Sequence, residues 1–275
     1  MGQRIIQVDS FTDRPFAGNP AAVCVMEKAA DATWMQNVAR EMNLSETAFV
    51  VPRAGAGGGA GAGASTFDLR WFTPAVEVNL CGHATLAAAH VLWETKRLRD
   101  DVSARFETKS GTLTCVKKDR WIEMDFPSTA ATKAPAPPGM LEALGVKIPG
   151  FVGRTRFDYL VEVASEQEVR ALSPDFGKLK RAEARGVIVT SRATESKEFD
   201  FVSRFFAPQA GVDEDPVTGS AHCALAPFWR ERLGKDSMIG YQASARGGIV
   251  RVTARAERVI LAGQAVTVLR GELIE

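Results

Sequence analysis

The sequence has few cysteines, almost no net charge and no long apolar run. Its four cysteines, at positions 24, 81, 115 and 223, have no metal-type spacing. We therefore expect free thiols in a reducing compartment. A formal net charge of +1 gives no overall field that would attract nucleic acid or a membrane surface. No apolar stretch could span a bilayer, and the first residues lack a signal-peptide core. These absences predict a cytoplasmic protein without nucleic acid or membrane partners.

The remaining composition is that of an ordinary globular chain. Of 275 residues, 45% are hydrophobic and 24% are charged, and this length suits two domains. Residues 54–65 are nearly all glycine and alanine. This run lacks the Lys-Ser/Thr ending of a phosphate-binding loop, so a mobile hairpin loop is the better interpretation.

One polar turn, residues 79–85, leads directly into a segment that has no polar face. Residues 86–93 read Leu-Ala-Ala-Ala-His-Val-Leu-Trp. A helix that is apolar or small on every side is normally buried all round. We therefore expect a central helix that starts at this turn. Its first backbone N–H groups and the positive end of its dipole would favour an anion.

The same pattern occurs a second time. Strand residues before the first turn recur before a second turn, and the helices that follow the two turns also match. Self-similarity on this scale indicates two copies of one domain. The identical pairs are Phe67/Phe201, Arg70/Arg204, Phe72/Phe206, Pro74/Pro208, Gly82/Gly219, Ala84/Ala221, Ala87/Ala224, Ala89/Ala226 and Glu94/Glu231.

Alternating apolar residues and turn signals predict mainly antiparallel strands around each central helix. Asp31 is expected to cap an outer helix that extends to Met42, and Pro227 should kink or shorten the second central helix. A Pro- and Ala-rich stretch after Phe126 reads as the linker. The predicted fold is α+β, with pseudo-symmetric barrel-like domains at 1–127 and 128–275, and the return of the last strand to the first domain is left open.

If the two halves face each other, two helix starts meet at one cleft. The cleft would then offer backbone donors at Gly82 and Gly219 and hydroxyl groups at Thr85, Thr218 and Ser220. Such donors suit a small carboxylate or a developing oxyanion.

The chemistry also needs a proton carrier, and the candidates are Glu46, His83 and Asp215. Glu46 opens a strand in the first half, whereas the second half has the uncharged run 186–188 at the corresponding place. This asymmetry favours a one-sided acid/base whose pKa is tuned by burial. The alternatives are a solvated strand end for Glu46 and helix caps for His83 and Asp215.

Other candidates are weaker. His90 and His222 lie within the helical stretches, and packing is the simpler interpretation of both. A metal site built from His83, His222 and Asp215 resembles no tight ligand set, so no metal is expected. Racemisation by two thiols would use Cys81, but the other half carries Thr218 at that place, and a threonine hydroxyl does not ionise.

Several motifs together resemble the phenazine biosynthesis-like (PhzF-like) isomerase family, which is related in fold to diaminopimelate epimerase. The likeness covers nearly the whole chain in order. Its motifs are Asp9-Ser10-Phe11, Phe16-Ala17-Gly18-Asn19-Pro20, Ser45-Glu46-Thr47-Ala48-Phe49, Arg70-Trp71-Phe72-Thr73-Pro74, Cys81-Gly82-His83-Ala84-Thr85 and Glu214-Asp215-Pro216-Val217-Thr218-Gly219-Ser220, with Gln242, Ser244, Arg246, Gly247 and Gly248 near the end.

The resemblance implies a homodimeric, cofactor-independent isomerase that moves a proton within a small cyclic amino or hydroxy acid. By position, Glu46 matches the acid/base. His83 and Asp215 match groups that polarise the substrate. Asn19, Gly82, Thr218, Gly219 and Ser220 are the expected substrate-binding residues.

Cys81 is a departure, because enzymes of phenazine synthesis carry a small residue there. The chain resembles the branch whose substrates are unassigned. The competing hypotheses are a racemase or epimerase that depends on Cys81 and a non-catalytic protein that binds small carboxylates.

Overall fold

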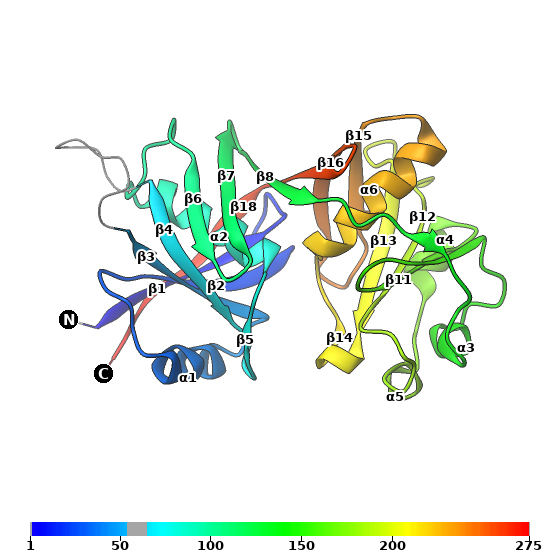
Figure 1. The fold of residues 1–275 in the computed structure, drawn as a ribbon, viewed down its shortest axis with the longest axis horizontal. Coiled ribbons are helices and arrows are strands. Elements are labelled where there is room, and N and C mark those ends of the chain that lie inside the picture. The colour runs from blue at the N-terminus through cyan, green and yellow to red at the C-terminus, as the bar shows by residue number, and fades with distance from the viewer. Residues whose placement is uncertain (1, 54–64, 275) are drawn as a thin grey trace. The chain divides into compact units, whose positions relative to one another are not determined.

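The computed structural model describes residues 2–53 and 65–274 and is dominated by β-strands (Figure 1). The glycine- and alanine-rich loop predicted at 54–65 lies, except for Ser65, outside the described residues. Within the described part of the chain, no helix is both long enough and apolar enough to cross a membrane.

The chain divides into two compact units. The first contains residues 1–125 together with 262–275, and the second contains residues 126–261. The final strand, β18 (Ala265–Leu273), pairs antiparallel with β1 (Gln3–Ser10) in the first unit. The chain thus passes from one unit to the other twice. The sequence analysis placed a boundary after residue 127 and left open the return of the last strand to the first domain.

The first unit is a sheet wrapped on a helix. Its strands pair in the order β1, β2, β3, β4, β6, β7 and β8, and only the β2–β3 and β4–β6 pairs are parallel among these. Its remaining elements are β2 (Asn19–Val25), α1 (Ala32–Met42), β3 (Glu46–Pro52), β4 (Thr66–Phe72), β5 (Glu77–Val78), α2 (Gly82–Glu94), β6 (Ala104–Thr108), β7 (Gly111–Lys118) and β8 (Trp121–Pro127).

The second unit repeats this pairing scheme. Strands β10, β11, β12, β13, β15 and β16 pair in sequence, and again the second and fourth pairs are parallel. Its elements are β9 (Thr132–Lys133), α3 (Met140–Leu144), β10 (Phe151–Arg154), β11 (Tyr159–Glu162), α4 (Glu166–Ala171), α5 (Phe176–Leu179), β12 (Val187–Arg192), β13 (Phe201–Ala207), η1 (Pro208–Ala210), β14 (Val212–Glu214), α6 (Gly219–Leu233), β15 (Ser237–Gln242), β16 (Gly248–Arg255) and β17 (Arg258–Gly263).

Helices α2 and α6 are the central helices that the sequence predicted. Ten of the 13 residues of α2 are buried, which confirms a helix without a polar face. Nine of the first eleven residues of α6 are buried in the same way, and the two exceptions are Ser220 and Pro227. The fold class predicted from the sequence, α+β with two related domains around central helices, is confirmed.

A repeated ion pair also marks the two copies. The guanidinium of Arg70 donates two hydrogen bonds to Glu77, at 2.8 and 2.9 Å, and Arg204 donates two to Glu214, at 2.7 and 2.8 Å. Each arginine also lies over the phenylalanine two residues further along its strand, 5.1 Å from the ring centroid for Arg70 and 4.8 Å for Arg204. The arginine and phenylalanine that recur in the sequence thus make equivalent contacts in both units.

The sequence predicted that Pro227 kinks or shortens the second central helix, and the helix is not shortened. Helix α6 has 15 residues and continues past Pro227 to Leu233. Proline lacks the N–H that would bond the carbonyl of Cys223 four residues earlier. That carbonyl instead accepts a hydrogen bond from the backbone N–H of Thr129, at 3.1 Å, so the lost helical bond is replaced.

Local hydrogen bonds set the starts of two elements in the second unit. Strand β11 begins at Tyr159, because the hydroxyl of Thr155 accepts the backbone N–H groups of Phe157 and Asp158 in a turn. Helix α4, which Ser165 caps, was not predicted. The predicted outer helix from Asp31 to Met42 is confirmed, with Asp31 accepting from Thr33 N–H.

The buried core around α2 can be tested with two leucines of one segment. Leu86 is fully buried and Leu80 is about half exposed. We expect Leu86→Ala to lower the free energy of unfolding by about 2–5 kcal/mol, because it leaves a cavity. Leu80→Ala should change it by less than about 0.5 kcal/mol. Urea unfolding followed by circular dichroism measures both, and equal effects would contradict the central position of α2.

Candidate active site

The first unit places Glu46 against His83. Glu46 is the first residue of β3, and His83 is the second residue of α2. Their atoms Oε2 and Nε2 are 3.0 Å apart, and the two side chains are only 18% and 7% exposed. The sequence analysis proposed both residues as catalytic, and the fold brings them together at the start of the central helix.

Local structure fixes this position. The hydroxyl of Ser10, at the end of β1, donates to the backbone carbonyl of His83 at 2.8 Å. Glu46 pairs in register with Ala21 of the parallel strand β2. The hydroxyl of Thr85 donates to the carbonyl of Cys81 at 2.6 Å and thereby closes the first turn of the helix. The hydroxyl of Thr85, which the sequence analysis expected in the cleft, therefore donates its hydrogen bond within the helix.

Cys81 completes the group. Its sulfur lies 3.5 Å from Nδ1 of His83 and 4.0 Å from Nε2, and its residue is buried. It stands at the N-cap position of α2, but its side chain makes no capping hydrogen bond. One imidazole thus contacts both a carboxylate and a thiol.

The charges of the three groups follow from burial and contact. Burial raises the pKa of Glu46, but the charge of His83 and hydrogen bonds from His83 and Cys81 outweigh it and leave the pKa below its ordinary value. Burial likewise lowers the pKa of His83, but the adjacent Cys81 and Glu46 raise it well above its ordinary value.

The thiol itself behaves differently. Burial, together with the charge of Glu46, raises the pKa of Cys81 to about 11. A group with that pKa is a neutral thiol at neutral pH, so the anion that charges His83 there is the Glu46 carboxylate. The resting site is an imidazolium–carboxylate pair beside a thiol.

One carboxylate oxygen of Glu46 remains able to accept a proton. The Oε2 atom of Glu46 is buried, and within the described residues it makes no hydrogen bond of regular geometry, although Nε2 of His83 lies 3.0 Å away. A carboxylate oxygen held by charge and without a directed hydrogen bond keeps a lone pair for a proton.

The same three residues also form a group of possible metal ligands. One donor atom each from Glu46, Cys81 and His83 lies within 4.8 Å of the others. Among the described residues, the combination of His83, His222 and Asp215 does not form such a group.

The turn before α6 in the second unit holds Asp215. The hydroxyl of Thr218, the N-cap residue, donates to Oδ2 of Asp215 instead of capping the helix. Gln242 is fully buried and links the turn to β15. Its amide accepts from Thr218 N–H at 2.9 Å and donates to the Asp215 carbonyl at 2.7 Å.

The remaining predicted binding residues lie at strand and helix starts. Gly82 and Gly219 are the first residues of α2 and α6, and neither N-cap residue gives its helix a side-chain hydrogen bond. Ser220 is half-buried beside Gly219, and Asn19 is buried at the start of β2. Both helix starts therefore keep backbone N–H groups that side chains of the N-cap residues do not occupy.

The register of the strands shows what replaces Glu46 in the second unit. Thr47 pairs with Phe72, and the equivalent pair is Val187 with Phe206, so Gly186 occupies the position of Glu46. A Cβ at Gly186 would lie 2.3 Å from the ring of Phe205. The second copy has no room for a side chain there.

The other two histidines have structural contacts. His222 is fully buried, its Nδ1 lies 2.8 Å from the Thr218 carbonyl, and burial lowers its pKa to about 4. Nε2 of His90 lies 3.1 Å from the hydroxyl of Thr267 on β18. These contacts agree with the packing interpretation of both residues.

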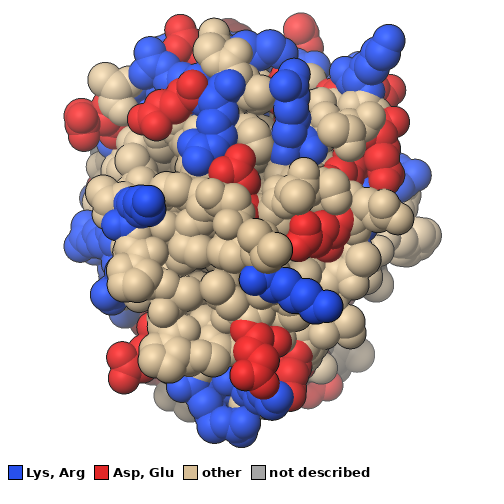
Figure 2. Space-filling model, turned by 90° about the vertical axis from the view of Figure 1, so that its right-hand side faces the viewer, with Lys and Arg blue, Asp and Glu red and all other residues tan. Residues whose placement is uncertain are grey.

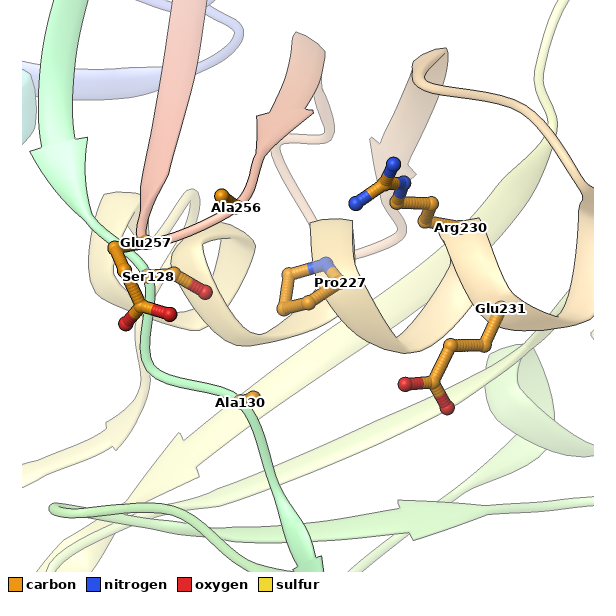
Figure 3. Close-up of a pocket in the computed structure, with 7 residues that line it drawn as sticks. All are labelled: Ser128, Ala130, Pro227, Arg230, Glu231, Ala256 and Glu257. Atoms are coloured by element: carbon orange, nitrogen blue, oxygen red, sulfur yellow. The ribbon is translucent and has the colours of Figure 1, made fainter.

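A separate cavity of about 430 Å³ lies in the second unit (Figure 3). The cavity contains none of the predicted site residues, and Arg230 and Glu231 point to different sides of it (Figure 3). The residues that line the cavity are Ser128, Ala130, Pro227, Arg230, Glu231, Ala256 and Glu257.

On the face shown in Figure 2, acidic and basic side chains are intermingled and form no patch of one sign.

Sequence reasoning missed two residues that hold the candidate site. Ser10 and Gln242 both lie in motifs that carried the family resemblance, but neither was assigned a role. A buried glutamine with both amide atoms bonded is visible only when β15 is placed beside the turn.

Comparison with known proteins shows the family of the chain. Residues 8–271 match the family model described as phenazine biosynthesis-like protein. An uncharacterized isomerase of Halalkalibacterium halodurans is 51% identical over 98% of both chains. The human phenazine biosynthesis-like domain-containing protein is 39% identical over 98% of both.

Solved structures show the same relationship. A PhzF-family protein of Enterococcus faecalis superposes with a TM-score of 0.91, at 39% identity and over the whole of both chains. A hydroxyproline epimerase of Agrobacterium vitis, at 10% identity and a TM-score of 0.58, covers 98% of this chain and 92% of its own and shares the fold. The chain belongs to the phenazine biosynthesis-like family, and it is an isomerase.

Proposed function

We propose that this isomerase moves a proton within a small cyclic amino or hydroxy acid, without a cofactor, and that Glu46 is its general acid/base. The observation that carries the proposal is the buried contact between Glu46 and His83 at the start of α2. A buried carboxylate beside a histidine is an arrangement suited to proton transfer.

The resting charges fit a base that later acts as an acid. Glu46 starts as a carboxylate and takes a proton from a carbon of the substrate. The electrons of that C–H bond move into the conjugated system of the substrate. Protonated Glu46 then returns the proton to another atom, so that no atom or electron is gained or lost.

A carboxylate with a lowered pKa is a weak base, and the substrate must therefore be made more acidic. His83 is charged in the resting site and can stabilise negative charge that develops on the substrate. When negative charge develops on the substrate beside His83, the imidazolium interacts with the substrate as well as with Glu46. The pKa of Glu46 then rises, because His83 stabilises its carboxylate less.

Substrate binding is assigned to the helix starts. Gly82 and Gly219 present backbone N–H groups, and a carboxylate is the anion that such groups favour. Asn19, Thr218 and Ser220 would supply further polar contacts, and Asp215 would hold an amino or hydroxyl group. Thr218 supports the role of Asp215 by fixing its carboxylate.

The alternatives have less support. A racemase that uses Cys81 needs a thiolate, but burial raises the pKa of this thiol to about 11, and its counterpart is Thr218. If the protein only bound carboxylates, the buried contact between Glu46 and His83 would have no chemical role. A homodimeric state and a cytoplasmic location remain predictions.

Glu46→Gln tests the acid/base role. A screen of cyclic amino and hydroxy acids in heavy water, followed by mass spectrometry, would find a substrate that gains deuterium. In the variant we expect the exchange rate to fall by about 10²–10⁴-fold, because an amide neither accepts nor returns the proton. The binding of the substrate should be largely retained.

Glu41→Gln is the matched control, because Glu41 is an exposed glutamate at the end of α1. It should exchange at the wild-type rate. Wild-type exchange in Glu46→Gln would reject the assignment of Glu46.

The ion pair also predicts a pH dependence of stability. The pKa of Glu46 is lowered by folding, so its contribution is present above its ordinary value of 4.5 and is lost as the pH falls through the lowered pKa. The pKa of His83 is raised, so its contribution is complete below 6.5 and is lost as the pH rises through the raised pKa.

His83→Gln should remove both contributions. We expect the difference in free energy of unfolding between the wild type and this variant to be greatest between pH 4.5 and 6.5 and smaller on either side. Urea titrations at a series of pH values measure it. A difference that grows steadily with pH would contradict the charged pair.

A further inference from the structure

The last strand of the first unit has one free edge. Strand β18 pairs antiparallel with β1, from Gln3 with Leu273 to Ser10 with Ala265. Within residues 2–53 and 65–274, no strand pairs with its other edge. The backbone N–H and C=O groups along such an edge can bond to a strand of another chain.

The second half of this edge is open to solvent. Residues 269–272 are all exposed, although successive side chains of a strand point to opposite faces. Leu269 is 47% exposed, and Ile274, directly after the strand, is 97% exposed. In the neighbouring strand β1, five of the eight residues are buried. Both faces of β18 are therefore accessible over this half.

The equivalent edge of the second unit is short. There β9 pairs with β10 as β18 pairs with β1, but β9 has two residues and β18 has nine. The residues after β9 read Ala-Pro-Ala-Pro-Pro, and proline has no N–H to donate. Short edge strands and prolines protect a sheet against pairing with another chain. Strand β18 contains no proline and keeps the long edge that β9 lacks.

We propose that two copies of this chain associate through β18, with the two β18 strands antiparallel and a two-fold axis at Gly271. The sheet of the first unit then continues from one copy into the other. In this register Arg270 lies opposite the partner's Glu272, and Leu269 lies opposite the partner's Leu273. The inference concerns assembly and goes beyond the proposed reaction.

The charges along the edge are complementary about Gly271. A two-fold axis forms each contact twice, so the pair of Arg270 and Glu272 occurs at two places. Opposite charges on facing residues of antiparallel strands stabilise the pairing, and like charges destabilise it. An axis at Arg270 or at Glu272 would place like charges opposite each other.

The apolar residues of the edge match in the same register. Leu269 faces the partner's Leu273 on one side of the sheet, and Val268 faces the partner's Ile274 on the other side. Pairing would cover the exposed side chains of Leu269 and Ile274, and the burial of apolar surface favours association.

Glycine at the centre fits the close approach of a second backbone. A Cβ at Gly271 would lie 3.7 Å from the side chains of Ile5 and Leu269, which is an ordinary contact distance. The chain itself therefore leaves room for a larger residue. Glycine weakens a strand and often marks a site where another backbone comes close.

The contacts that the two charged residues make within the chain leave the edge free. Arg270 lies 2.8 Å from Glu94 at the end of α2, and the two side chains are 61% and 31% exposed. Exposed salt bridges of this kind contribute little to stability. Glu272 pairs in register with Arg4 of β1. Neither contact uses the backbone groups of the free edge.

Sedimentation velocity over a range of protein concentrations measures the association. The wild type should form a dimer. Arg270→Glu places like charges opposite each other at two positions, and so does Glu272→Arg. We expect either change to raise the dissociation constant of the dimer about tenfold or more. A wild type that stays monomeric at every concentration would overturn the proposal.

Arg270→Glu combined with Glu272→Arg restores opposite charges in the proposed register. The dissociation constant of this double variant should return to within about threefold of the wild-type value. Arg105→Glu is the matched control, because Arg105 is an exposed arginine of β6 in the same unit, and it should leave the dimer unchanged. A dimer that resists both single reversals, or a double variant that dissociates as readily as they do, would contradict the proposal.

A disulfide tests the register without relying on charge. Gly271→Cys places two thiols at the two-fold axis, where facing Cα atoms of antiparallel strands are about 4.5–5.5 Å apart, within the range of a disulfide. The four native cysteines are buried and should not crosslink. Under mild oxidation we expect a covalent dimer from Gly271→Cys and none from Ile148→Cys, at an exposed residue of the second unit. Equal crosslinking of the two variants, or none in Gly271→Cys, would reject the axis at Gly271.

Discussion

The burial of α2 on all sides is the constraint on which the first unit depends. A helix whose residues are apolar or small around its whole circumference must be enclosed, and the strands β1, β2, β3 and β18 pack against it. A polar side chain within it needs a bonding partner, as His90 has in Thr267, whereas the ends of the helix can carry other polar groups. The N-terminal end carries free backbone N–H groups, and the chain places Cys81 and His83 there. The position of the candidate site is therefore a consequence of the composition of this helix.

The second unit has a buried central helix as well, but different polar residues lie near its start. The strand pairings, the arginine–glutamate pairs and the central helix all recur. The charged pair does not recur, because Gly186 stands where Glu46 stands and Phe205 fills the space that a side chain would need. One scaffold thus carries a carboxylate–imidazole pair, Glu46 and His83, in one copy and a hydroxyl–carboxylate pair, Thr218 and Asp215, in the other. The two units share their strand pairings and central helix, and they differ at the few positions that carry the candidate site residues.

The sequence was sufficient to predict the central helices, because their composition alone excludes an exposed face. It also predicted that Glu46 has no acidic counterpart. It could not predict the length of α6, since the partner that replaces the missing N–H of Pro227 is Thr129, 98 positions earlier in the chain. Nor could it find Gln242, whose role depends on the parallel pairing of β15 with β13. Contacts between distant segments decide these features, and neither periodicity nor motif spacing records them.

The buried pair of Glu46 and His83 also bears on why the site needs two kinds of neighbour. Burial alone would leave the carboxylate protonated and the imidazole neutral, and such a site would lack both a base and a positive charge. Contact between them restores both charges, but it also weakens the base.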